Sequence, residues 1–204
     1  WPAIVMALGI DMPKKVYGHG WLLIGGDKLS KSKQDKVKTE LTDPKEFVAR
    51  YGSDALRYYL LREIPFGSDG AYSNEAFLLR INGDLSNDLG NLVSRTTAMI
   101  NQYFNGVLPA AGEKAAIDDE LIAIANGVFD SVKKAVEEIN VPKALSEIFR
   151  LVGRANKYID ETTPWILAKD ESKKSRLATV LYNLSECVRI AAVNLLPFIP
   201  KAPV

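Results

Sequence analysis

The chain has 204 residues, of which 47% are hydrophobic and 25% charged, and its formal net charge is +1. This composition predicts a soluble globular protein of one or two domains, and the small net charge excludes binding through a global basic field, so any anion site must be local. A single histidine and a single cysteine exclude a zinc cluster, an internal disulfide and most activated-serine hydrolysis. No apolar run is long enough to span a bilayer.

The first part of the chain is predicted to be mixed α/β. It opens on Trp1 with an apolar run that lacks any start signal, which predicts a piece of a longer protein. Residues 15–24 are aromatic and β-branched enough for a strand, with bends at Gly18 and Gly20. The Gly25-Gly26-Asp27 turn after this strand predicts a short hairpin.

Two helices are predicted next. Asp43 is placed to cap the first, Pro44 to occupy its first position and Gly52 to end it. Ser53 is expected to cap the second helix. The apolar face of that helix includes Leu56, Tyr59 and Leu60.

From about Ser73 onward the apolar periodicity is entirely helical. Four apolar stripes recur at helical spacing. The first connection between them contains Gly106 and Pro109, the second Pro142 and the third Pro164, and the last stripe ends before Pro197. The stripes comprise Leu85 to Tyr103, Leu121 to Ile139, Leu145 to Ile159 and Leu177 to Leu195. The predicted fold is therefore mainly α, an antiparallel bundle that comes after the α/β segment at a boundary near residue 72. Cys187 lies in the last stripe and is expected to be a buried thiol in a reducing compartment.

A short loop after the predicted strand combines lysines with serines. Its sequence is Lys28-Leu29-Ser30-Lys31-Ser32. Two ammonium groups confined to one small polar loop indicate an anion site, whereas the alternative is an ordinary solvated turn.

The loop resembles the KMSKS signature of the class I aminoacyl-tRNA synthetases, with leucine in place of methionine. The flanks His19-Gly20-Trp21 and 50–61 are similar to the same family. Two further stretches, 87–95 and Thr162-Thr163-Pro164-Trp165, resemble the methionyl-tRNA synthetases of bacteria. The resemblance implies that residues 1–72 form the end of a Rossmann-type α/β catalytic domain with a stem-contact segment, and that 73–204 form the helical anticodon-binding domain.

The same resemblance implies the chemistry of the loop. Lys31, assisted by Lys28, would stabilise charge on the phosphates of Mg²⁺-bound ATP as methionine becomes an adenylate. The ATP contacts implied by the family comprise Lys28, Leu29, Ser30, Lys31 and Ser32, with His19 and Leu22 approaching the nucleotide; a structural histidine is the alternative for His19. After Ser32 this chain departs from the family, with Lys33-Gln34-Asp35 and a longer stretch up to Thr42.

Three residues of the helical half are implied to read the anticodon. On a wheel of 100° per residue, Asn91 and Arg95 point together, about 100° or more from the apolar stripe. Trp165 comes after Pro164 in the first turn of a short helix, with Thr162 or Thr163 as its cap. The alternatives are a solvated flank for the first two and a packing anchor for Trp165, which is also the expectation for Trp1 and Trp21.

The implied partners are tRNA(Met), methionine and ATP, in the cytoplasm. The HIGH signature, the zinc-binding insert and most of the methionine pocket of the family are not in this sequence, so the chain alone is expected to be inactive and to hold no metal. Two alternatives stay open. The chain could belong to another class I synthetase, of the leucyl, isoleucyl, valyl or cysteinyl type, or to a stand-alone tRNA-binding module. The sequence predicts no oligomeric state.

Overall fold

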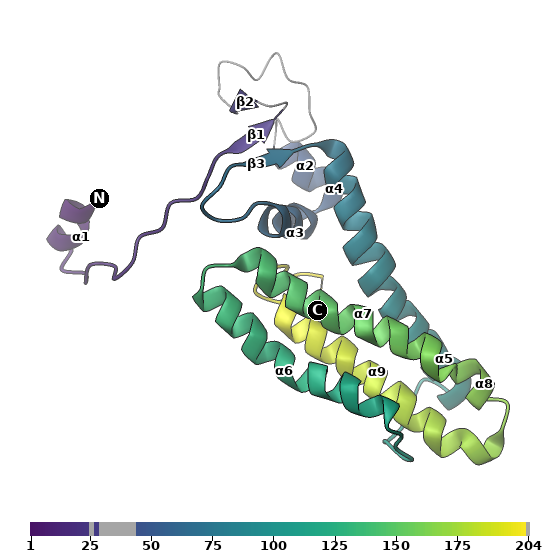
Figure 1. The fold of residues 1–204 in the computed structure, drawn as a ribbon. Coiled ribbons are helices and arrows are strands. Elements are labelled where there is room, and N and C mark those ends of the chain that lie inside the picture. The colour runs from purple at the N-terminus through teal and green to yellow at the C-terminus, as the bar shows by residue number, and fades with distance from the viewer. Residues whose placement is uncertain (25–26, 29–43, 203–204) are drawn as a thin grey trace.

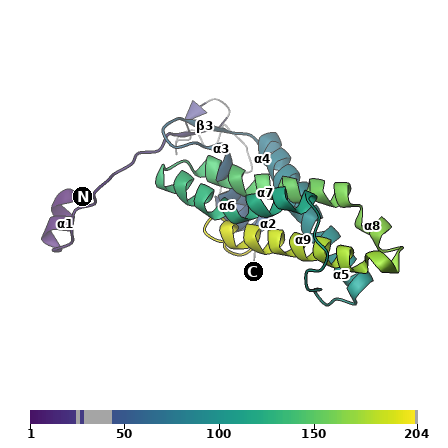
Figure 2. The ribbon, with the colours of Figure 1, turned by 60° about the horizontal axis from the view of Figure 1, so that its bottom comes forward.

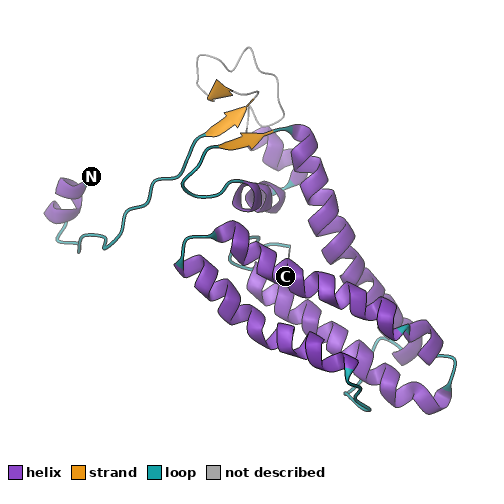
Figure 3. Cartoon of the chain, in the orientation of Figure 1, coloured by secondary structure: helices purple, strands orange, loops and turns teal. Residues whose placement is uncertain are grey.

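A computed structural model describes residues 1–24, 27–28 and 44–202. Three long helices lie side by side as a bundle, a small sheet lies beyond one end of it, and the N-terminus projects away (Figures 1 and 3). The view in Figure 2 shows the same three helices, α6, α7 and α9, still adjacent after rotation. No helix in the described part of the chain is long and apolar enough to cross a membrane.

Nearly all of the first 19 residues are exposed. Helix α1 (Pro2–Ala7) contains no buried residue, and an extended stretch joins it to the sheet (Figure 1). Trp1 and Trp21 are more than half exposed. Both side chains are thus more exposed in this structure than the packing role expected of them implies.

The sheet has three short strands in the order β2-β1-β3. Strand β1 (Leu22–Ile24) pairs antiparallel with β2 (Asp27–Lys28), which confirms the hairpin, and parallel with β3 (Gly70–Tyr72). The strand is much shorter than the predicted 15–24. Gly20 lies just before it, and a Cβ there would meet the carbonyl oxygen of Ser68 at 2.0 Å, so the close approach of the two segments requires glycine.

Helices α2 (Pro44–Tyr51) and α3 (Ser53–Glu63) begin and end close to where the sequence predicts. Gly52 separates them at φ 82°, a conformation that favours glycine. Ser53 does not cap α3, because Gly52 occupies the N-cap position and Ser53 is already helical. A small core of aromatic side chains joins these helices to the sheet and to α4: Phe47, Tyr59, Tyr72 and Phe77.

One long helical path leads from this unit to the bundle. Helix α4 (Asn74–Arg80) is capped by Ser73, whose Oγ accepts a hydrogen bond from the Ala76 N–H over 3.1 Å. The path continues as a π-helix, η3 (Ile81–Gly90), and then as α5 (Asn91–Phe104). The sequence predicts α-helical periodicity here, so the ten-residue π segment is an unpredicted feature. The path ends at Asn105, at φ 53°.

The bundle contains α6 (Ile117–Glu137), α7 (Val141–Thr162) and α9 (Lys174–Leu195), packed with α5. Two short elements connect α7 to α9: α8 (Pro164–Leu167) and the 3₁₀ turn η4 (Glu171–Lys173). Helix α7 runs antiparallel to α6 and α9, since Asp118 near the start of α6 bonds both Tyr158 near the end of α7 and Arg176 near the start of α9. The predicted mainly α, antiparallel bundle is confirmed.

The buried Asp118 carboxylate anchors one end of this bundle. It accepts hydrogen bonds from both terminal nitrogens of Arg176, at 2.6 and 2.7 Å, and from the Tyr158 hydroxyl at 2.6 Å. The Ala115 N–H donates to it as well, over 3.0 Å. Cys187 is buried in the same bundle, as predicted.

Candidate functional site

Helices α5, α7 and α8 come together at one end of the bundle (Figure 1), and two of them carry the candidate RNA-reading residues: Asn91 and Arg95 on α5, and Trp165 on α8. Asn91 is the first residue of α5, and Arg95 lies one turn later. Asn91 is exposed and the Arg95 side chain is 38% exposed, whereas Leu92 between them is fully buried. The helix therefore turns its apolar side to the core and presents the amide and the guanidinium to solvent, as the wheel predicts.

Helix α7 supplies a carboxylate to this site. Nη2 of Arg95 lies 2.8 Å from Oδ1 of Asp160, and the Asp160 side chain is 66% exposed. One turn earlier on α7, the Asn156 amide donates to the carbonyl oxygen of Asp88 over 2.9 Å. These two contacts fix the end of α7 beside the start of α5. Sequence reasoning missed Asp160, because a single carboxylate on a solvated helix face carries no motif.

Trp165 is presented by a sharp turn after α7. Thr163 has φ 43° and ψ 61°, an uncommon conformation for a β-branched residue, and it redirects the chain before Pro164 starts α8. Thr163 occupies the N-cap position, although its side chain makes no capping hydrogen bond. Trp165 is 41% exposed and its neighbour Ile166 is 52% exposed. An indole that is open to solvent on one side can accept a stacked base.

Asn91 and Arg95 thus belong to α5 and Trp165 to α8. Helix α7 contacts α5 through Asp160 and leads into α8. Asp160, which holds Arg95, lies five residues before Trp165 in sequence. An amide, a guanidinium and an exposed indole are the groups that bind single-stranded RNA, by hydrogen bonds to base edges and by stacking. The arrangement can bind unpaired bases without a broad basic surface.

The candidate nucleotide site is described only in part. Leu29, Ser30, Lys31 and Ser32 lie outside the described residues. Of the remaining predicted contacts, Lys28 belongs to β2 and Leu22 to β1, so the loop leaves from the end of a hairpin. Nδ1 of the exposed His19 lies 2.8 Å from the carbonyl oxygen of Gly20.

His19 and Leu22 line one pocket of about 330 Å³. The remaining lining is almost entirely apolar: Gly20, Leu60, Leu61, Ile64, Pro65 and Phe66. Such a lining suits a ring or an alkyl chain better than phosphates. Among the described residues, no group of three or more His, Cys, Asp or Glu side chains is placed to hold a metal ion.

Two known families match successive parts of the chain. Residues 1–97 match the family described as tRNA synthetases class I (M), and residues 108–204 match the anticodon binding domain of methionyl tRNA ligase. These matches, together with the small sheet and the helical bundle after it, place the chain among the class I aminoacyl-tRNA synthetases.

Individual relatives show which family of class I synthetases the chain belongs to. The methionine–tRNA ligase of Clostridium tetani is 59% identical over 201 residues, which are 98% of this chain and 31% of that protein. The ligase of Clostridium perfringens is 55% identical over 204 residues, which are 100% of this chain and 31% of that protein. The chain thus belongs to the methionyl-tRNA ligase family, and it spans about a third of the length of these curated relatives.

Solved structures resemble the chain over its whole length. Mycobacterium tuberculosis methionyl-tRNA synthetase in complex with methionyl-adenylate aligns with a TM-score of 0.88 and 40% identity, over 100% of this chain and 39% of that one. The apo form of the same synthetase aligns with a TM-score of 0.84 and 38% identity, over 100% of this chain and 38% of that one. The described fold is therefore the fold of part of a methionyl-tRNA synthetase.

Proposed function

We propose that the protein containing this chain ligates methionine to tRNA(Met) with ATP, and that residues 73–204 read the anticodon. The observation that carries the proposal is the set of solvent-accessible Asn91 and Arg95 on α5 and Trp165 on α8, in a bundle whose residues 108–204 match the anticodon binding domain of methionyl tRNA ligase. In this arrangement, Trp165 stacks on an anticodon base while Asn91 and Arg95 address base edges.

Residues 1–72 supply the other part of the proposed function. Lys31, assisted by Lys28, contacts the phosphates of ATP and stabilises the charge that develops on pyrophosphate as it leaves. The ordinary form of ATP carries Mg²⁺, which would neutralise part of the same charge. His19 and Leu22 sit beside the nucleotide, and a segment within residues 1–72 contacts the tRNA stem. Because tRNA charging requires ATP and free tRNA, the protein is assigned to the cytoplasm.

The chain by itself supplies only part of this machinery. It spans about a third of its curated relatives, so the adenylate would form only when the remaining catalytic residues are present. Anticodon binding needs only the bundle. Binding is therefore the function that can be tested on the 204-residue chain.

The test is a titration of the chain with an RNA hairpin that carries the CAU anticodon, measured by fluorescence anisotropy. A hairpin of the same stem with a GGA anticodon is the control. Tighter binding of the CAU hairpin, by about tenfold or more, is expected from the loss of one or two base contacts worth about 1–3 kcal/mol each. Equal binding of both hairpins would exclude anticodon reading.

A further inference from the structure

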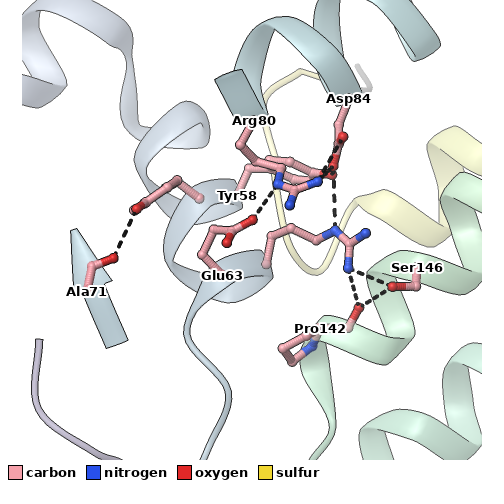
Figure 4. Close-up of polar contacts among 9 residues, drawn as sticks. Tyr58, Glu63, Ala71, Arg80, Asp84, Pro142 and Ser146 are labelled. Carbon is pink, nitrogen blue, oxygen red and sulfur yellow. Dashed lines mark hydrogen bonds and ion pairs between the residues drawn. The ribbon is translucent and has the colours of Figure 1, made fainter. Parts of the chain in front are cut away.

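A cluster of polar side chains lies where the sheet-bearing unit meets the bundle (Figure 4). We name it the junction cluster, and it comprises Tyr58, Arg62 and Glu63 of α3, Arg80 at the end of α4, and Asp84 in the π segment. The Asp84 carboxylate accepts a hydrogen bond from the Tyr58 hydroxyl over 2.5 Å and two from Nη1 of Arg80 over 3.2 and 3.3 Å. Arg80 also pairs with Glu63.

Arg62 connects this cluster to the first turns of α7. Its Nε lies 3.5 Å from Oδ2 of Asp84, and its Nη1 donates to the Ser146 hydroxyl over 2.6 Å and to the Pro142 carbonyl oxygen over 3.1 Å. The Ser146 hydroxyl in turn donates to the same carbonyl over 3.0 Å. One planar guanidinium therefore holds three elements, α3, the π segment and α7, in a single geometry.

The cluster is shielded enough for these contacts to be specific. Tyr58 is fully buried, and the side chains of Asp84 and Arg62 are 14% and 21% exposed. Burial raises the pKa of Tyr58, and the neighbouring Asp84 carboxylate raises it further, so the phenol stays protonated and donates. The Tyr58 ring also contacts Phe149 of α7, with ring centroids 5.6 Å apart. Polar and apolar contacts thus join α3 to α7 at the same place.

The junction cluster lies just ahead of the RNA-reading residues along the chain. Asp84 is the fourth residue of the π segment, and α5 with Asn91 and Arg95 begins directly after that segment. A π-helix closes i→i+5 hydrogen bonds and rotates less per residue than an α-helix. A return of η3 to α-helical winding would therefore turn Asn91 and Arg95 to a different direction relative to α4.

We propose that Arg62 is a positioning residue that fixes the sheet-bearing unit relative to the RNA-reading end of the bundle. This inference rests on the proposed function, because its consequence is that one tRNA reaches both parts at once. A tRNA that contacts the protein at two points binds more tightly than at one only if the two contact sites keep the correct separation. Loosening the junction lowers this gain in affinity and leaves the anticodon contact itself intact.

The experiment compares two RNAs on the 204-residue chain, whole tRNA(Met) and its isolated anticodon hairpin. The wild-type chain is expected to bind whole tRNA more tightly than the hairpin. Arg62→Gln removes the contacts to Asp84, Pro142 and Ser146, and is expected to weaken whole-tRNA binding about tenfold while changing hairpin binding less than about twofold. Arg62→Lys keeps the charge without the planar fork, and is expected to recover only part of the loss.

Two further variants separate positioning from stability. Ser146→Ala leaves every charge in place, keeps the fold, and is expected to weaken whole-tRNA binding about threefold with the hairpin unaffected. Arg150→Gln is the matched control, since Arg150 lies one turn further along α7, is exposed and pairs only locally with Glu147. It is expected to bind both RNAs as the wild type does. Circular dichroism melting identifies any variant that fails to fold, and Ser146→Ala then decides the outcome.

The possible failures point to different errors. If Arg62→Gln and Ser146→Ala weaken the binding of whole tRNA and of the hairpin equally, the positioning role is overturned. It is also overturned if they weaken the binding of neither RNA. In both cases the anticodon site stands. A wild-type chain that binds neither RNA overturns the proposed function instead. Equal binding of whole tRNA and hairpin by the wild type shows that only one point is held, which also overturns the inference.

Discussion

Arg95 on α5 and Asp160 on α7 form an ion pair in which Nη2 and Oδ1 are 2.8 Å apart. The pair orients the guanidinium, but it also occupies one of its donors and places a negative charge where RNA phosphates would approach. RNA that binds here as proposed must therefore compete with Asp160 for Arg95. Because both side chains are well exposed, this competition is weak.

Replacing Asp160 by Asn should tighten binding of the anticodon hairpin. The change frees the guanidinium and removes one repulsive charge, and an exposed pair is worth about 0.2–1 kcal/mol, so affinity should rise by up to about fivefold. Fluorescence anisotropy at low and high salt measures it. Glu137→Gln, which removes a carboxylate from an exposed pair on α6, is the control and should change little. Weaker binding by Asp160→Asn would show that the carboxylate orients Arg95 more than it competes.

Replacing Lys31 by Ala should slow methionine activation strongly in the full-length protein. If the ammonium contacts the phosphates mainly in the transition state, its loss should lower the rate of adenylate formation about 10²–10³-fold and leave methionine affinity nearly unchanged. ATP–pyrophosphate exchange measures the rate. Lys33→Ala, two residues further along the same loop, is the matched control. Near-normal exchange by Lys31→Ala would remove Lys31 from the mechanism.

Replacing Asp118 by Asn should destabilise the bundle in a pH-dependent way. Burial by itself would raise the pKa of Asp118, but the hydrogen bonds from Arg176 and Tyr158 outweigh it and hold the pKa below its usual range. The carboxylate therefore contributes stability that is complete above the unfolded pKa of about 3.9 and is lost as the pH falls through the folded value.

Urea unfolding of the wild type and of Asp118→Asn measures the difference between their free energies of unfolding. At pH 7, Asp118→Asn should cost about 3 kcal/mol, because it leaves the largely shielded Arg176 guanidinium without a full charge partner. The gap between variant and wild type should shrink as the pH is lowered toward about 3. Asp130→Asn, at an exposed position of the same helix, should show neither effect. A gap that stays constant with pH would contradict the account of this cluster.

The Cys187 thiol should be unreactive in the folded chain. Burial, with a smaller contribution from Glu186, raises the pKa of Cys187 to about 12. At pH 8 the thiolate is then about a thousandfold rarer than for a free cysteine, and reaction with a disulfide reagent should slow at least in proportion. Absorbance of the released thiolate measures the rate, and the urea-unfolded chain provides the fast reference. Rapid reaction in native buffer would show that this part of the bundle opens readily.

The helix ends were predictable because proline and glycine restrict the backbone locally. Pro44, Pro142 and Pro164 each lie in a first turn, where the missing N–H is not needed, and Gly52 adopts the positive φ that separates α2 from α3. The apolar stripes predicted the bundle core for a similar reason, since helical spacing alone decides which side chains can be buried together. Both features depend on short-range sequence.

The π segment could not be predicted from spacing. Its apolar residues Ile81, Leu85 and Leu89 recur every four positions, which suits an α-helix and a π-helix alike. In the structure, Asp84 of this segment bonds Tyr58 of α3, a contact that only the fold brings about. The pairing of Arg95 with Asp160 escaped prediction for the same reason.

Trp165 tests the central claim most directly, because stacking on an aromatic side chain is worth about 1–3 kcal/mol per base. The measurement is a filter-binding titration of the full-length protein with an elongator tRNA(Met) and with an anticodon-swapped copy, for the wild type, Trp165→Ala and Trp165→Phe. We expect Trp165→Ala to weaken binding of tRNA(Met) about ten- to a hundredfold and Trp165→Phe to recover part of the loss, while methionine activation stays unchanged. If Trp165→Ala binds both tRNAs as the wild type does, Trp165 only packs against the bundle and the chain does not read the anticodon in the way proposed.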